Sequence, residues 1–119
     1  MFKLAIPLLH ASNSTAAEDF YCNRLSFSTG VRTSRRRSQA GPLLHGLERD
    51  GVWLHVSSFS GDGISGGVVN VIVENVDDLH EELVGKDVDI DTGPVDQTWG
   101  SREMYVKDAD GNSIRFIEQ

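Results

Sequence analysis

The stretch GPVDQTWGSREMYVKDADGNSIRF, residues 93–116, decides the fold prediction. After a Gly-Pro turn, two runs that are strand candidates, 102–107 and 113–117, flank the dipeptide Asp110-Gly111. Glycine tolerates positive φ, so Asp-Gly between two such runs is typical of a tight β-hairpin. The stretch therefore predicts two antiparallel strands near the end of the chain.

A second hairpin of the same kind is expected in the first half. Runs 43–48 and 52–57 flank Asp50-Gly51, and Gly51 lies 60 residues before Gly111. Ser14 likewise lies 61 residues before Asn75, so the offset between corresponding positions is nearly constant. This regularity indicates an internal duplication at the level of pattern.

A strand and a helix are expected before the first hairpin. The apolar run 2–10 predicts a strand. Thr15 with Glu18 three residues later forms a capping box, and Ser14 is a competing cap. We therefore expect a helix over 16–25, followed by a short strand at 27–31.

The second half repeats this order. The run 68–73 predicts a strand, and Asn75 caps a helix that Gly85 ends. A short strand is expected at 88–90, before the hairpin of residues 93–116.

Each half thus consists of a strand, a helix and three further strands. The Gly- and Ser-rich stretch 57–67 connects the halves. A unit of about 60 residues buries little surface when it stands alone. We therefore expect an α+β protein in which a single domain, 1–119, contains two βαβββ units, 1–60 and 67–119.

Charge restricts the class of partner. The chain has 11 basic and 18 acidic residues, a formal net charge of −7. Nucleic acid is not expected as a partner, because phosphates require a basic face. Acidic residues are concentrated in 74–96, and their field favours a cationic small molecule.

The run RTSRRRSQAG, residues 32–41, holds Arg32, Arg35, Arg36 and Arg37. A solvated loop or a basic edge strand that resists sheet-to-sheet pairing explains it. A nucleic-acid patch is disfavoured because no aromatic residues lie among the arginines.

The sequence favours a cytoplasmic protein without a membrane partner. No apolar run approaches the roughly 20 residues that a membrane span needs. The N-terminus lacks the pattern of a signal peptide. Cys22 is the only cysteine, so no intrachain disulfide forms.

The WG-x-RE-x-x-x-x-D-x-DGN pattern of residues 99–112 resembles the last hairpin of bleomycin-resistance-type members of the vicinal oxygen chelate superfamily. This superfamily also includes glyoxalases, extradiol dioxygenases and fosfomycin resistance enzymes. The opening AIPLLHASNSTAAEDFYCNRLSFS, residues 5–28, resembles the first strand and helix of these members, including Pro7. The resemblance implies curled mixed sheets, a homodimer with grooves at its interface, and exchange of the first strand about Pro7. A bend in an edge strand explains Pro7 equally well, because proline has no N–H to donate.

The resemblance also places the metal ligands of the superfamily at Ile6, His55, Val68 and Arg115. Only His55 is able to coordinate a metal ion, and Arg115 adds a permanent positive charge. We therefore expect no metal and no cofactor.

A shifted register offers an alternative metal site. His10 shares a strand face with Ile6, and the shift would bring His10, His55 and Glu103 into one cup. Three such ligands would suit a metal-dependent lyase, dioxygenase or thiol transferase of the same superfamily.

Stacking residues are the other candidates for function. By resemblance Trp99 lines the groove, where an indole stacks on planar rings or attracts a cation; packing over the end of the core is its alternative role. Trp53 and His55 share a strand face, and Phe59 either closes over a ligand or packs on the core. By resemblance Glu103 is the groove acid. The candidate ligand-binding residues are Trp53, His55, Phe59, Trp99, Glu103 and Arg115.

These observations favour a metal-free, homodimeric binding protein that sequesters a cationic or planar aromatic small molecule and so confers antibiotic resistance. No catalytic residue is assigned. The enzyme of the same superfamily is the first alternative. A regulatory module that binds an unrelated metabolite is the second.

Overall fold

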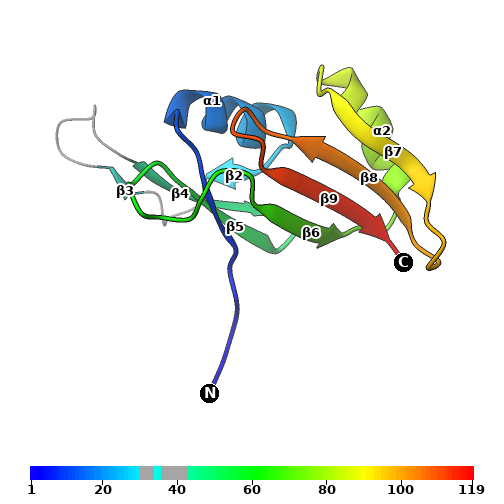
Figure 1. Cartoon of the computed structure of the whole chain (residues 1–119), viewed down its shortest axis with the longest axis horizontal. Coiled ribbons are helices and arrows are strands. Elements are labelled where there is room, and N and C mark those ends of the chain that lie inside the picture. The colour runs from blue at the N-terminus through cyan, green and yellow to red at the C-terminus, as the bar shows by residue number, and fades with distance from the viewer. Residues whose placement is uncertain (30–33, 36–42) are drawn as a thin grey trace. The chain divides into compact units, whose positions relative to one another are not determined.

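The computed structural model describes residues 1–29, 34–35 and 43–119 and divides into two compact units (Figure 1). The first unit is Met1–Ser65 and the second is Gly66–Gln119. Among the described residues, no helix is long and apolar enough to cross a membrane.

The first unit forms a mixed sheet with helical turns on one face. Its sheet order is β1-β5-β4-β2, and β3 also pairs with β4. β1 runs parallel to β5, whereas the other pairs are antiparallel. The elements are β1 (Leu8–His10), α1 (Ser14–Glu18), the π-helix η1 (Asp19–Arg24), β2 (Ser28–Thr29), β3 (Ser34–Arg35), β4 (Leu43–Arg49) and β5 (Val52–Ser57).

The second unit repeats this strand order without a counterpart of β3. Its sheet order is β6-β9-β8-β7, with β6 parallel to β9 and the other pairs antiparallel. The two units confirm the α+β prediction of two βαβββ repeats with mixed sheets. The elements are β6 (Val68–Ile72), α2 (Val76–Gly85), β7 (Ile90–Asp96), β8 (Arg102–Lys107) and β9 (Ser113–Glu118).

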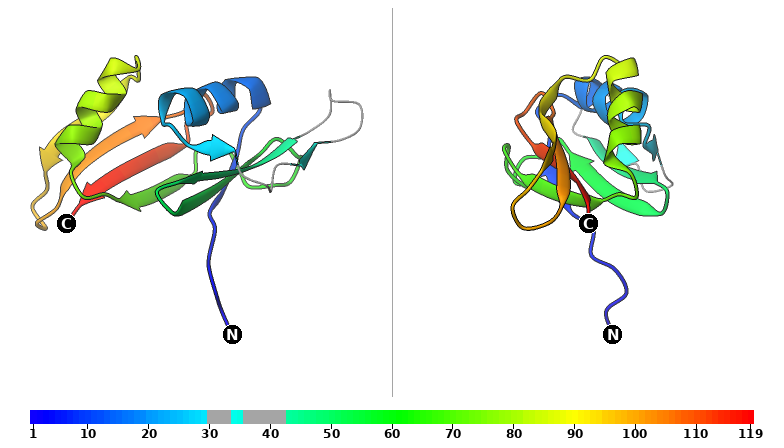
Figure 2. Two further views of the ribbon diagram at one scale, coloured as in Figure 1. Left: turned by 180° about the vertical axis from the view of Figure 1, so that it is seen from behind. Right: turned by 90° about the vertical axis from the view of Figure 1, so that its right-hand side faces the viewer.

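Each unit buries apolar side chains between its sheet and its helix. In the second unit α2 covers one face of the sheet (Figure 2), and Leu83 of α2 is buried with Met104 and Phe116 of the strands. In the first unit Tyr21 of η1 is buried with Leu54, and its ring meets that of Phe27 edge to face. Since one face of each sheet is used in this way, the opposite face is available for function.

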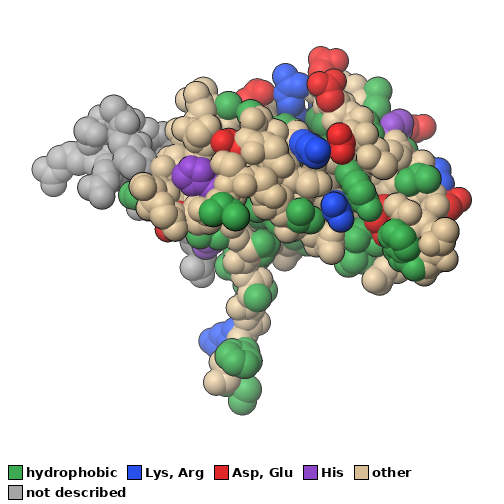
Figure 3. Space-filling model, in the orientation of Figure 1, with side chains coloured by type: hydrophobic (Ala, Val, Ile, Leu, Met, Phe, Trp, Pro, Cys, Tyr) green, Lys and Arg blue, Asp and Glu red, His purple; other side chains and the backbone are tan. Residues whose placement is uncertain are grey.

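The first strand is shorter than expected. Only Leu8–His10 pairs with β5 as a strand, while residues 1–5 are exposed and lead away from the sheet (Figure 1). Apart from Lys3 this segment is apolar, and its side chains stand out from the body of the protein (Figure 3). Pro7 lies just before the strand, and its carbonyl accepts a hydrogen bond from the His55 amide at 3.0 Å. The expected strand over 2–10 was too long because apolar character alone supplies no partner strand.

The first helix begins earlier than expected. Asn13, in extended conformation, is the N-cap, and its side chain accepts a hydrogen bond from the Ala16 amide at 2.9 Å. The predicted caps, Thr15 and Ser14, both lie inside the helix. Asn caps as well as Ser does, so the choice among three adjacent polar residues depends on backbone geometry.

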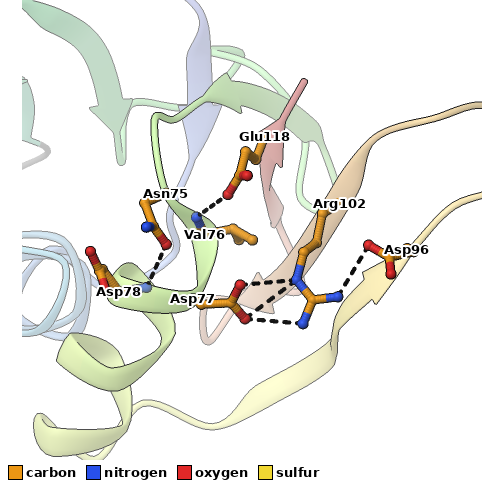
Figure 4. Close-up of polar contacts among 7 residues, drawn as sticks. All are labelled: Asn75, Val76, Asp77, Asp78, Asp96, Arg102 and Glu118. Atoms are coloured by element: carbon orange, nitrogen blue, oxygen red, sulfur yellow. Dashed lines mark hydrogen bonds and ion pairs between the residues drawn. The ribbon is translucent and has the colours of Figure 1, made fainter.

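The second helix follows the prediction, with Asn75 as N-cap and Gly85 as its last residue. Asn75 accepts from the Asp78 amide at 3.0 Å, and Glu118 of β9 accepts from the Val76 amide at 2.8 Å. Arg102 on β8 donates to both carboxylate oxygens of Asp77 and to Asp96 (Figure 4). These bonds fix the start of α2 to the sheet.

Gly93-Pro94 is not the expected turn before the hairpin. Both residues lie inside β7, where the register with β8 shifts between Thr92 and Val95. Gly93 has φ +86°, and a Cβ atom there would overlap the carbonyl oxygen of Glu103. This bulge therefore holds β7 close against the backbone of Glu103.

The structure describes only part of the arginine-rich run, residues 32–41. Arg35 lies in β3, which pairs with β4. Arg32, Arg36 and Arg37 lie outside the described residues.

We predict that Gly93→Ala destabilises the protein by at least about 2 kcal/mol, because alanine resists positive φ and its methyl group meets the backbone of β8. Urea unfolding measures the change.

Gly85→Ala is the matched control. Gly85 lies in a helix, and a methyl group added there would point into open space, so alanine should be neutral or stabilise by roughly 0.5 kcal/mol. Equal midpoints for the two variants would contradict the role of the bulge.

Candidate functional site

The second sheet has one face that α2 does not cover. We call it the open face. Side chains on this face alternate with the buried ones, and the β6 residues Val68 and Ile72 are 54% and 55% exposed there. The register places Asn70, Arg115 and Tyr105 side by side across β6, β9 and β8. The open face consists of Val68, Asn70, Ile72, Glu103, Tyr105, Lys107, Ser113, Arg115 and Ile117.

Glu103 is the centre of a hydrogen-bonded cluster on this face. Its side chain is 4% exposed. One carboxylate oxygen accepts from Trp99 Nε1 at 3.0 Å and from the Ser101 hydroxyl at 2.5 Å; the other accepts from the Tyr105 hydroxyl at 2.6 Å. All three donors lie within four residues of Glu103, so the loop before β8 and the strand itself build the cluster.

These donors keep Glu103 ionised. The hydrogen bonds from Ser101, Tyr105 and Trp99, with the charge of Arg115, lower the pKa of the Glu103 carboxyl despite burial. The same carboxylate and burial raise the pKa of Tyr105. The Tyr105 hydroxyl therefore remains a donor to a charged acceptor over the neutral pH range.

Trp99 is held at its edge and exposed on its faces. Its side chain is 69% exposed although its N–H is bonded to Glu103. Covering the end of the core would bury the indole, so this exposure does not fit the alternative role for Trp99. The arrangement offers an aromatic surface whose orientation is fixed in advance.

Arg115 completes the cluster. Its guanidinium carbon lies 4.5 Å from the centroid of the Tyr105 ring. Its Nε atom is buried and has no hydrogen-bond partner among the described residues. A fixed positive charge thus lies beside a fixed aromatic ring on the open face.

The other predicted site residues lie in the first unit. Trp53 and His55 share one face of β5, and Leu8 pairs with His55. Buried His55 Nε2 has no hydrogen-bond partner within the described part of the chain. Phe59 is partly buried, and its amide donates to Ser57 at 3.1 Å.

The residues considered for a metal do not form a ligand cluster. No group of three or more His, Cys, Asp or Glu within residues 1–29, 34–35 and 43–119 is placed to hold a metal ion. His10 Nδ1 is bonded to the Asp62 carbonyl oxygen at 3.1 Å, and both oxygens of Glu103 accept from side chains.

Ser101 and Tyr105 were not among the predicted site residues. They lie two positions before and after Glu103, which places all three on one side of an extended chain. This spacing was the available signal, because hydroxyl groups flanking a carboxylate on one strand face can both donate to it.

We predict that Glu103→Ala lowers stability by roughly 2 kcal/mol, because it leaves buried donors without an acceptor. It should also free the Trp99 indole, which lowers the fluorescence anisotropy of that residue in a Trp53→Phe background. Urea unfolding and time-resolved anisotropy measure both effects.

Glu103→Gln is the conservative control. Its amide oxygen accepts from Trp99 and Ser101, and its NH₂ donates to the Tyr105 oxygen, so the cluster should survive with a smaller loss. The lowered pKa of Glu103 stabilises the fold above about pH 4.3 and ceases to do so as pH falls through that pKa. The difference in unfolding free energy between wild type and Glu103→Gln should therefore become smaller in acid. A difference that does not change with pH would contradict the cluster.

A family model described as "glyoxalase superfamily protein" matches residues 1–119. No curated protein matches the sequence significantly. A bleomycin-binding protein solved with bleomycin superposes with a TM-score of 0.73 at 20% identity, covering 99% of each chain.

Two further solved structures have the same fold. TnmS3, an antibiotic-binding protein from Streptomyces sp. CB03234, gives a TM-score of 0.74 at 20% identity and covers 99% of this chain and 98% of its own. A member of the glyoxalase/bleomycin resistance protein/dioxygenase superfamily from Sphaerobacter thermophilus gives a TM-score of 0.73 at 20% identity. The match covers 99% of this chain and 98% of that protein. The match of the family model over the whole chain, together with these folds, shows that the chain belongs to the glyoxalase superfamily.

Proposed function

We propose that this chain binds a small molecule with a planar aromatic ring and sequesters it without chemical conversion. The observation that carries the proposal is the state of Trp99, whose indole is 69% exposed while its N–H is bonded to a buried carboxylate. Sequestration needs only tight reversible binding, to which a ring held in place contributes.

The fixed indole reduces the entropic cost of binding. A free surface tryptophan would lose rotamer freedom when a ligand stacks on it, whereas the bond to Glu103 has already restricted Trp99. Stacked aromatic pairs contribute about 0.5–1.5 kcal/mol beyond the area that they bury.

The functions of two structural neighbours suggest the ligand class. One neighbour is a bleomycin-binding protein and another an antibiotic-binding protein, each about 20% identical to this chain. We propose an antibiotic-like ligand on this basis, with a role in resistance. The net charge of −7 favours a cationic ligand at long range.

We propose that binding requires no metal. Arg115 lies on the open face next to Asn70 of β6, and its permanent charge repels a divalent cation. A lyase, dioxygenase or thiol transferase of the superfamily would need several ligands around His55 instead.

We further propose a homodimer whose interface contains the binding grooves. Val68 and Ile72 on the open face, and Phe2 and Leu4 before β1, are large apolar side chains that water now contacts. A second copy of the chain would cover them, with Pro7 as the hinge for exchange of the first strand.

Trp99→Ala should weaken bleomycin binding about 10-fold or more, since the stacking surface is lost, whereas Trp99→Phe should lose less. Fluorescence titration in a Trp53→Phe background follows Trp99 alone, and calorimetry provides the affinity.

The absence of any saturable change at micromolar bleomycin, or equal affinity in Trp99→Ala, would contradict the proposal. The same purified protein, prepared without chelators, should hold no stoichiometric transition metal. A metal that is lost in His55→Ala would favour the enzyme.

Sedimentation velocity should show a dimer at micromolar concentration, because two open faces and two apolar N-terminal segments would be covered. Removal of residues 1–6 should weaken the dimer if the first strand is exchanged. Ile72→Lys, at the end of β6, should also weaken the dimer, because it places a charge on the open face. A wild-type protein that stays monomeric at these concentrations would contradict the proposal.

A further inference from the structure

We propose that Arg115 binds an acidic group of the ligand, so that the guest of the open face is a planar aromatic acid. This inference rests on the proposed function and specifies its ligand class. It reverses the preference for a cation that the net charge suggests.

Arg115 lacks the hydrogen bonds that other described arginines make. Arg24 donates to Asp19, Arg49 to the Leu25 carbonyl, and Arg102 to Asp77 and Asp96. The Arg115 guanidinium lies over the Tyr105 ring and near the Glu103 charge, and no hydrogen bond or ion pair to it is found among the described residues. Its N–H groups therefore remain available to an acceptor from outside the chain.

The position of Arg115 in the sheet raises the free-energy cost of its missing hydrogen bonds. β9 is an inner strand of the sheet, so Arg115 lies between Asn70 and Tyr105 and is partly buried. Its Nε is shielded from water, with no partner in the described part of the chain, which costs more free energy than an exposed N–H would. Arg115 as a whole is partly exposed, so an oxyanion from outside would approach the end of the guanidinium and accept from its terminal N–H groups as a bidentate pair.

The nearby carboxylate does not fill this role. Glu103 lies close enough for the Arg115 charge to lower its pKa, yet its oxygens accept from Trp99, Ser101 and Tyr105. Three of the roughly four acceptor sites of the carboxylate are thus occupied by its neighbours in the loop and in β8.

Three acids of the second unit pair with Arg102 or Lys107 rather than with Arg115. Asp77 and Asp96 bond to Arg102 (Figure 4), and Asp91 lies 3.9 Å from Lys107. Of the two basic side chains on the open face, Lys107 therefore has an acidic neighbour in Asp91, whereas Arg115 has no ion pair among the described residues.

One chain of contacts links the two recognition groups. Trp99 is bonded to Glu103, Glu103 to Tyr105, and Tyr105 lies under Arg115. A ring that stacks on Trp99 and an acidic substituent at Arg115 would use both groups at once.

Three probes with the same ring system and different charge test this inference: naphthoate, naphthamide and naphthylmethylamine. Calorimetry on the full chain should give the tightest binding for naphthoate. Arg115→Gln should reduce naphthoate affinity about 10-fold or more and leave naphthamide affinity within about 2-fold. The naphthoate affinity of Arg115→Lys should lie between those of wild type and Arg115→Gln, because lysine keeps the charge and loses the planar guanidinium.

Arg24→Gln is the matched control, since Arg24 lies in the first unit and pairs with Asp19; it should leave all three affinities unchanged. Thermal melting verifies that each variant is folded. Trp99→Ala should weaken all three probes alike.

Binding that depends on Trp99 but shows no preference for naphthoate, or favours the amine, would overturn the inference and leave the proposed function intact. Failure of all three probes to bind would contradict both. A naphthoate preference that persists in Arg115→Gln would assign the acid to another residue and overturn the role of Arg115.

Discussion

A buried carboxylate that accepts three hydrogen bonds is the constraint on which the open face depends. Glu103 could not be buried as an ion without donors, and Trp99, Ser101 and Tyr105 supply them. Each donor is fixed in return, so one charge determines the position of an exposed indole and of the ring beneath Arg115. The open face is thus ordered from inside the protein before any ligand arrives.

The hairpins and the second helix were predictable because their signals are local. Asp50 and Gly51 adopt φ of +52° and +82°, the conformation that an Asp-Gly pair favours, and Asn75 and Gly85 bound α2 as expected. The extent of β1 was not predictable in the same way. Whether residues 1–5 continue a strand depends on a partner strand, which sequence periodicity does not reveal.

The site was predictable only in part. Alternation along β8 places Ser101, Glu103 and Tyr105 on one side, but which side is open depends on where α2 packs. The acidic composition of 74–96 pointed to a cation, whereas Arg102 pairs with two of those acids and Arg115 stays available. Net charge describes the field around the protein, and contacts describe the chemistry at one face.

The fold and the site are held by different parts of the sequence, which explains how the fold persists at 20% identity in its structural neighbours. The β7 bulge at Gly93, the hairpin turns and the buried face of the sheet fix the backbone of β8 and β9. Exposed side chains of the open face, such as Val68 and Ile72, are absent from that core, so they can change without loss of the scaffold, whereas Glu103 is buried. Specificity for the proposed ligand would therefore depend on residues such as Trp99, whose indole is largely exposed, and Arg115, whose Nε has no hydrogen-bond partner among the described residues.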